Sequence, residues 1–196
     1  MPPPIGGGGG RDELIFLPLG GVGEIGMNLG LYGFGPARAR RWLVVDFGVA
    51  FAHSDLPGVD LIFPDIAYLE ERKSAIAGIV ITHAHEDHFG ALIDLWPRLR
   101  VPVYATAFTA GLLSAKLASA PSAAAIPVTL VKAGERVNVG PFDVEYINVA
   151  HSIPESNALA IRTPLGTVIH TGDWKLDDHP TVGLPTDEAR LAAIGV

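Results

Sequence analysis

The chain has no cysteine among its 196 residues. Disulfide bonds and thiolate metal sites are therefore excluded, and any metal ion must be held by histidine, aspartate or glutamate. This absence fits a reducing cytoplasm, where disulfides are rare. No apolar run approaches the roughly 20 residues of a membrane helix, and the N-terminus lacks the apolar core of a signal peptide. We therefore expect a soluble, cytoplasmic protein without a membrane partner.

Positive charge is also scarce. The chain has 14 lysines and arginines against 21 aspartates and glutamates, giving a formal net charge of −7. Its longest basic cluster is the segment 38–41, Arg-Ala-Arg-Arg. The broad positive footprint of many nucleic-acid-binding proteins is therefore missing, although a bound dication would locally offset the acidic balance.

Short strand-like segments separated by glycine and proline turns dominate a chain long enough for one domain. Strands are expected over 14–19, 27–32, 42–46, 79–82, 101–104, 127–131, 136–139, 142–149, 158–162 and 167–170. Helices are expected over 68–73, 89–96, 106–119 and 187–194. Pro97 would end the second helix, and Thr186 would cap the last. Hairpins mixed with single helices indicate an α+β or mixed α/β fold. The Pro- and Gly-rich residues 1–12 are expected to form a flexible tail before a domain over 13–196.

The most informative segment is 83–88, His-Ala-His-Glu-Asp-His, which follows an apolar, strand-like run. Imidazole and carboxylate are the ligands that Zn²⁺ and its first-row neighbours prefer. On a loop that leaves a strand, His83 and His85 can converge on one ion, while Asp87 and His88 continue the turn into a helix. Five imidazole or carboxylate residues in six positions, in a chain with seven histidines, favour a metal site over an incidental polar loop.

Further ligand-type residues come directly after other strand-like runs. Taken alone, His151 and Asp173 would each be a cap or a hydrogen-bonding group, but beside segment 83–88 they supply the ligands that a binuclear site needs. Asp46 is expected to orient an imidazole N–H group, an interpretation that ranks level with plain loop capping. The remaining histidines lack ligand partners in the sequence and are expected to be structural or exposed: His53, His170 and His179.

Residues 21–26, Gly-Val-Gly-Glu-Ile-Gly, match the G-x-G-x-x-G fingerprint of dinucleotide-binding proteins. That fingerprint requires a helix to open at the motif, whereas residues 27–33 have a strand-like rhythm with further glycines. A turn between two strands is the better interpretation, and no nucleotide cofactor is expected. A G-x-S-x-G elbow is absent from the sequence, so a serine hydrolase has no support.

The order His-x-His-x-Asp-His, a strand-end histidine and Thr-Gly-Asp resembles the metallo-β-lactamase superfamily. Longer strings look like bacterial ribonuclease J, of the β-CASP group in that superfamily. These strings are residues 16–26, 81–91, 151–156 and 170–175. The resemblance covers nearly the whole chain after the tail.

The resemblance implies a four-layer αββα fold with two zinc ions between its sheets, Mn²⁺ being an alternative metal. By position, His83, His85 and His151 would bind one ion. Asp87 and His88 would bind the other, and Asp173 would bridge the two. Asp87 and Asp173 would serve catalysis, in which a hydroxide held between the ions attacks an RNA phosphodiester in line. RNA would be the partner, degraded from its 5′ end and also cut internally.

The resemblance also implies that the chain is an N-terminal portion of the fold. The β-CASP insertion and the C-terminal part of the second sheet would lie outside it, together with a further zinc-ligand histidine. The second metal site would then be incomplete, and the fragment inactive or weak alone. A homo-oligomer formed through the missing regions stays open. So do a stand-alone metallo-hydrolase of a thioester or lactone and a non-catalytic, metal-stabilised interaction module.

Overall fold

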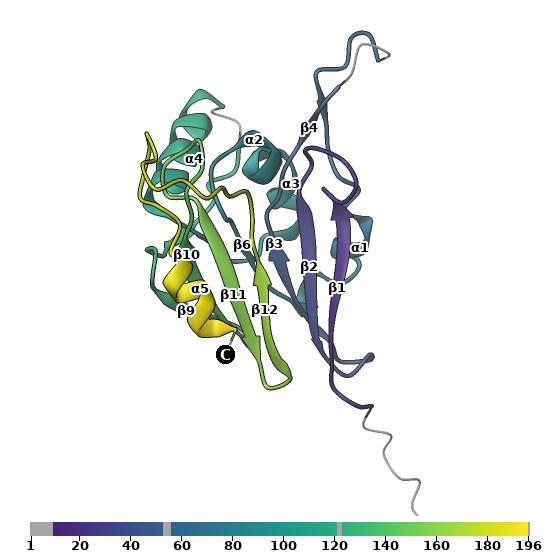
Figure 1. Ribbon diagram of the computed structural model, residues 1–196. Helices are drawn as coiled ribbons and strands as arrows, with labels where there is room; N and C mark the ends of the chain where they lie inside the picture. The colour runs from purple at the N-terminus through teal and green to yellow at the C-terminus, as the bar shows by residue number, and fades with distance from the viewer. Residues whose placement is uncertain (1–9, 53–55, 121–122, 196) are drawn as a thin grey trace, which may run out of the picture.

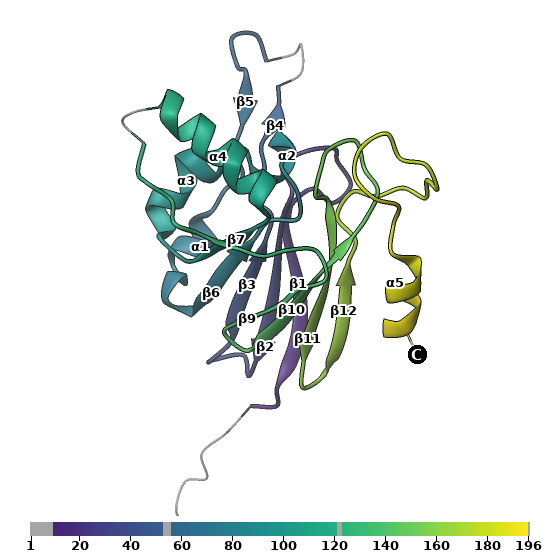
Figure 2. The same cartoon turned by 90° about the vertical axis from the view of Figure 1, so that its left-hand side faces the viewer.

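The computed structural model describes residues 10–52, 56–120 and 123–195, in which two β-sheets pack together with helices outside them (Figures 1 and 2). The strands are β1 (Glu13–Gly20), β2 (Leu29–Gly35), β3 (Arg41–Val45), β4 (Ala50–Phe51), β5 (Leu61–Ile62), β6 (Ile76–Val80), β7 (Val103–Ala105), β8 (Val128–Leu130), β9 (Arg136–Val139), β10 (Phe142–Asn148), β11 (Asn157–Thr163) and β12 (Gly166–His170). The helices are α1 (Ala67–Glu70), the 3₁₀ turn η1 (Lys73–Ala75), α2 (Glu86–Phe89), α3 (Leu92–Leu99), α4 (Ala107–Ser119) and α5 (Glu188–Ile194). All ten expected strands are confirmed to within a few residues.

The first sheet has the strand order β1-β2-β3-β6-β7-β8. Strands β1, β2 and β3 pair antiparallel, whereas β3, β6, β7 and β8 run parallel. Because parallel strands end at the same edge of a sheet, the residues after β3 and after β6 meet there. This edge brings Asp46, which follows β3, close to segment 83–88, which follows β6.

The second sheet is antiparallel, with the order β12-β11-β10-β9. Asn148 at the end of β10 pairs with Asn157 at the start of β11, and His170 at the end of β12 pairs with Leu159. The ends of β10 and β12 therefore lie beside the same end of β11. The loops carrying His151 and Asp173 both leave the sheet at that point.

Three apolar clusters hold four layers together. The outer face of the first sheet is covered by α1, α3 and α4, whose buried side chains include Leu69, Trp96 and Leu113. Between the sheets lies a second cluster, in which Tyr146 and other side chains are fully buried. Leu191 of α5 packs on the outer face of the second sheet. The helix–sheet–sheet–helix order is the expected four-layer αββα arrangement.

Two expectations about helix ends are wrong. Pro97 lies inside α3 rather than ending the preceding helix, and α3 stops where Arg100 adopts a left-handed conformation with φ of 54°. Burial explains the continuation, because Trp96 and Leu99 on either side of Pro97 both pack into the core. Phe89, the expected start of that helix, instead ends the separate turn α2.

The N-cap of α5 also differs from the expectation. Asp187, not Thr186, caps the helix by accepting a hydrogen bond from the backbone N–H of Arg190 at 2.9 Å. The hydroxyl of Thr186 is already engaged, because it donates to the carbonyl of Lys175 at 2.8 Å and accepts from the N–H of Ala150 at 2.9 Å. Thr186 therefore fastens the loop before α5 to the second sheet.

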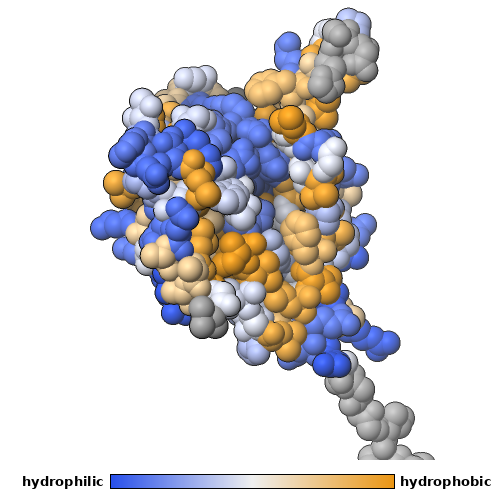
Figure 3. Space-filling view, viewed as in Figure 1, coloured by the Kyte–Doolittle hydropathy of each residue, from blue (hydrophilic) through white to orange (hydrophobic). Residues whose placement is uncertain are grey.

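The small hairpin of β4 and β5 was not expected from the sequence and projects from the rest of the molecule (Figure 2). Figure 3 shows apolar residues on this hairpin and between β12 and strands β1 and β2. The large apolar side chains exposed there include Phe51, Phe16 and Ile169. Among the described residues, none of the helices combines the length and apolarity needed to cross a membrane.

Candidate metal centre

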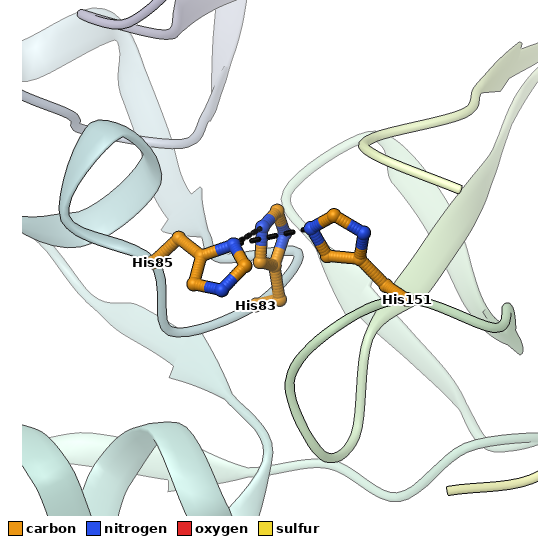
Figure 4. A group of neighbouring side chains, drawn as sticks. All are labelled: His83, His85 and His151. Carbon is orange, nitrogen blue, oxygen red and sulfur yellow. Dashed lines mark hydrogen bonds between the residues drawn. The ribbon is translucent and has the colours of Figure 1, made fainter. Parts of the chain in front are cut away.

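Three imidazoles converge at the edge where the two sheets meet. His83 and His85 come from the loop after β6, and His151 comes from the loop after β10 (Figure 4). Nδ1 of His85 lies 3.1 Å from Nε2 of His83 and 3.1 Å from Nε2 of His151. Three ring nitrogens facing one another with no oxygen between them form a donor set that suits one dication.

A second group of ligand atoms lies next to the first. It is formed by His83, His88 and Asp173. Nε2 of His88 lies 3.5 Å from Oδ1 of Asp173 and 3.5 Å from Oδ2 of Asp87. The other oxygen of Asp173 lies 3.7 Å from Nε2 of His151. One carboxylate thus faces both groups of histidines.

Asp46 sets the tautomers of the two buried histidines. Its carboxylate accepts hydrogen bonds from Nδ1 of His88 at 2.7 Å and from the backbone N–H and hydroxyl of Thr82 at 2.8 and 2.9 Å. Because the Thr82 hydroxyl donates to Asp46, it must accept from Nδ1 of His83, which lies 3.0 Å away. Both histidines therefore hold their Nδ1 protons inward and can turn Nε2 lone pairs toward the ligand group.

The charge states of the buried groups differ. Burial and the neighbouring His88 lower the pKa of His83 to about 3, so His83 is neutral, as a metal ligand must be. Burial also lowers the pKa of His151. For His88, burial acts downward, but the carboxylates of Asp46 and Asp173 outweigh it and raise the pKa to about 10. A metal ion at Nε2 of His88 would therefore displace a tightly held proton.

The carboxylates are ionised. Burial acts to raise the pKa of Asp46, but the charge and hydrogen bond of His88 outweigh it and hold that pKa below its usual value. A hydrogen bond from His88 lowers the pKa of Asp173 to about 2. The group therefore combines the neutral imidazoles of His83 and His151 with the negative oxygens of Asp46 and Asp173, and nitrogen and oxygen donors of this kind suit Zn²⁺ and Mn²⁺.

Close backbone packing fixes the turn that carries Asp87 and His88. The N–H of Phe47 donates to the carbonyl of His88 at 2.6 Å, and the N–H of Asn28 donates to the carbonyl of Asp87 at 2.8 Å. A Cβ atom on Gly48 would lie only 1.7 Å from the Asp87 carbonyl oxygen. Glycine is therefore required at position 48 for the loop after β3 to lie against α2.

Two cavities open beside the ligand group. One, of about 780 Å³, is lined by Asp87, Met27, Phe51 and neighbouring residues. The other, of about 340 Å³, is mainly polar, and His88 and Asp173 are among its lining residues. Both cavities thus reach residues of the ligand group, the larger at Asp87 and the smaller at His88 and Asp173.

The structure brings together every residue proposed as a metal ligand from the sequence: His83, His85, Asp87, His88, His151 and Asp173. Asp46 lies behind them and is hydrogen-bonded to His88 and Thr82, and its orienting role stays a prediction. His179 is exposed, His170 is partly buried and hydrogen-bonded to the hydroxyl of Tyr32 at 3.1 Å, and His53 lies outside the described residues.

Sequence reasoning missed Thr82 and Asn28. Thr82 relays the effect of Asp46 to His83, and the Asn28 side chain lies 3.2 Å from the Asp87 carboxylate and 3.0 Å from the His88 ring. The position of Thr82 directly before the histidine segment was the one available signal. For Asn28, 59 residues from Asp87 along the chain, the sequence offered none.

Comparison with known families defines the class of protein. Residues 41–193 match the beta-lactamase superfamily domain, and the chain belongs to that superfamily. A solved structure, the metallo-beta-lactamase fold protein YhfI from Bacillus subtilis, is similar with a TM-score of 0.59 at 16% identity, over 86% of this chain and 65% of that one. The expected metallo-β-lactamase fold is therefore confirmed.

Within that class, the chain is similar to several curated proteins named ribonuclease J. The protein of that name from Sinorhizobium meliloti is 62% identical over 184 residues, which are 94% of this chain and 33% of the relative. Ribonuclease J of Helicobacter pylori strain 26695 is 43% identical over 186 residues, 94% of this chain and 26% of the relative. The predicted resemblance to a portion of ribonuclease J is confirmed, and the chain spans about a third or less of the length of these relatives.

Proposed function

We propose that this chain provides the metal centre of a ribonuclease that hydrolyses RNA phosphodiester bonds. One observation carries the proposal, namely that His83, His85 and His151 converge from two sheets beside the His88–Asp173 pair. The 62% identity to a ribonuclease J supports RNA as the substrate. Action from the 5′ end and internal cutting are both part of the proposal.

In this proposal the ligand groups have separate roles. His83, His85 and His151 hold one ion, and His88 with Asp87 holds the second. Asp173 would contribute to both ions, because its oxygens lie 3.5 Å from the His88 nitrogen and 3.7 Å from the His151 nitrogen. Zn²⁺ is the proposed metal, and Mn²⁺ is the alternative that the same nitrogen and oxygen ligands would accept.

The ions, when bound, would lower the pKa of water and neutralise charge on the phosphate. The protein contributes the rest of the chemistry. Asp87 is partly exposed toward the larger cavity, where its carboxylate can orient the attacking water and accept its proton. Asp46, buried behind His88, keeps the Nδ1 proton of that ring in place and its Nε2 directed at the ligand group.

Two broader proposals concern the chain as a whole. The first is that residues 13–196 belong to one metallo-β-lactamase-like domain, in which strand β1 begins at Glu13, after a tail of residues 1–12. Residues 1–9 of that tail and residue 196 lie outside the described residues. A cytoplasmic location is supported by the absence of cysteine and by the ribonuclease relatives. A homo-oligomer stays a prediction.

The proposal is tested by metal content and RNA cleavage on the same preparations. We expect the purified chain to retain Zn²⁺ and to cleave end-labelled RNA weakly at high protein concentration. Asp173→Ala should abolish cleavage, and His85→Ala should abolish both cleavage and the binding of an ion at the three-histidine subsite. Asp178→Ala and His179→Ala are matched controls at exposed positions nearby, and both should behave as the native chain. A metal-loaded native chain without detectable cleavage would refute RNA hydrolysis by this chain.

The same preparations separate the two alternatives. A thioester or lactone hydrolase would turn over a panel of those substrates while leaving RNA intact. A non-catalytic module would bind metal and partner proteins without turnover of either substrate class. Partner binding that survives His85→Ala, with no activity in the native chain, would favour that second alternative.

A further inference from the structure

The glycine-rich loop between β1 and β2 is built around Asn28. A Cβ atom on Gly20 would lie 2.1 Å from the carbonyl oxygen of Met27, and one on Gly21 would lie 2.4 Å from Oδ1 of Asn28. Gly21 also has a φ of 81°, which glycine adopts without strain. Gly20 and Gly21, at the start of the segment that resembles a nucleotide fingerprint, therefore leave space for Met27 and Asn28 to pack against this loop.

Asn28 is fixed on the turn that carries Asp87 and His88. Its backbone N–H donates to the carbonyl of Asp87 at 2.8 Å, and its own carbonyl accepts from the N–H of Gly48 at 2.9 Å. The side-chain Nδ2 lies 3.1 Å from the Asp87 carbonyl, 3.2 Å from Oδ2 of Asp87 and 3.0 Å from Nε2 of His88. Two proposed ligands are thus contacted by one amide group.

The chemistry of these neighbours fixes the orientation of the amide. The Asp87 carbonyl and carboxylate oxygens are both acceptors, so the NH₂ end of Asn28 must face them. Its two hydrogens can serve these two oxygens. The same NH₂ group lies 3.0 Å from Nε2 of His88 and so limits where that ring can lie.

We propose that Asn28 is a positioning residue of the second metal subsite. It holds the Asp87 carboxylate by a hydrogen bond and limits the position of the His88 ring, so that both groups stay directed at the same subsite. The inference rests on the proposed function for the presence of that ion. Removal of the amide should therefore weaken binding at His88 and leave the three-histidine subsite unchanged.

The test is a Co²⁺ titration of the native chain followed by visible absorption, since Co²⁺ occupies zinc-type sites and reports their geometry. The band assigned to the second subsite is the one lost in His88→Ala and kept in His85→Ala. We expect Asn28→Ala and the size-matched Asn28→Leu to weaken this event about 10- to 100-fold, as is typical of groups that orient metal ligands. The event lost in His85→Ala should keep its native affinity.

Asn148→Ala is the matched control. The Asn148 amide also donates two hydrogen bonds to backbone carbonyls, at 3.2 and 2.7 Å, but on the loop before α5. This variant should lose stability without any change in the Co²⁺ spectrum. Circular dichroism confirms that each variant is folded.

The inference is overturned by unchanged second-event affinity in both folded Asn28 variants. It is equally overturned if the native chain binds no Co²⁺ through His88, or if Asn148→Ala weakens the second event as much as Asn28→Ala. Failure of the proposed function would give a different result. In that case the Co²⁺ affinities of the variants change as expected, but the native chain cleaves no RNA.

Discussion

Replacement of Asp46 by asparagine should damage both stability and metal binding. Asp46 is 1% exposed and has a φ of 62°, a conformation that asparagine tolerates better than most residues. Asp46→Asn therefore preserves size and backbone geometry and changes only the carboxylate. The substitution removes a negative charge and introduces an NH₂ group where Thr82 and His88 both need an acceptor.

The magnitude follows from the three hydrogen bonds that the carboxylate accepts. The amide oxygen can accept from the Thr82 backbone N–H, but the NH₂ end must then face the Thr82 hydroxyl and the His88 ring. Hydrogen bonds to charged groups contribute about 1.5–3 kcal/mol each, and breaking a buried charge pair costs about 3–5 kcal/mol. Because the Thr82 hydroxyl and the His88 ring can each reorganise in part, we expect a loss of about 3 kcal/mol in the free energy of unfolding. Zinc affinity should fall about 10- to 100-fold as His88 and His83 lose their fixed tautomers.

The assay is urea unfolding of the metal-free chain, followed by zinc titration of the folded protein. Asp143→Asn is the matched control, because Asp143 pairs with Arg136 at the surface and such pairs contribute about 0–1 kcal/mol. If Asp46→Asn stays within 1 kcal/mol of the native chain and binds zinc equally well, the orienting role of Asp46 is refuted.

Four further predictions concern a buried ion pair, two glycines and the effect of zinc on stability. Hydrogen bonds from its two arginine partners lower the pKa of Glu145 from 4.5 to about 2, so its stabilisation is complete above pH 4.5 and is lost toward pH 2. Glu145→Gln should cost roughly 2–3 kcal/mol at pH 7 and flatten urea-unfolding stability over that pH range. Gly48→Ala should lower the melting temperature through its clash with Asp87 and cost about 1–3 kcal/mol. Gly111→Ala, in open space on α4, should instead stabilise by about 0.4–1 kcal/mol. Zinc at 100 times its Kd should raise the unfolding free energy by about 2.7 kcal/mol, an increment that His151→Ala should remove.

The clustering of the proposed ligand residues was predictable because the segments that carry them follow apolar strands. Residues at the carboxyl ends of neighbouring strands meet at one sheet edge, so segment 83–88 and Asp46 could be expected together once β3 and β6 were recognised. His151 and Asp173 follow the same rule in the antiparallel sheet, where β10 and β12 both end beside the start of β11. Local sequence patterns are sufficient for this level of description.

The supporting contacts were not predictable, because they depend on registers and rotamers between distant segments. Thr82 reaches Asp46 across 36 residues, and Asn28 reaches Asp87 across 59. Neither contact leaves a periodic or compositional trace. At Pro97 the sequence pattern gave a wrong prediction. Proline is a strong local signal for the end of a helix, but here the burial of its neighbours Trp96 and Leu99 outweighed that signal.

The position of the ligands links metal binding to the packing of the two sheets. His83 and His88 leave the first sheet and are buried against Asp46, whereas His151 and Asp173 leave the second sheet and are more exposed. The buried half of the proposed centre is therefore assembled without an ion, and the second half is held against it by the apolar cluster between the sheets. An ion held by both halves binds only the packed state, so it must stabilise sheet packing as much as sheet packing favours its binding.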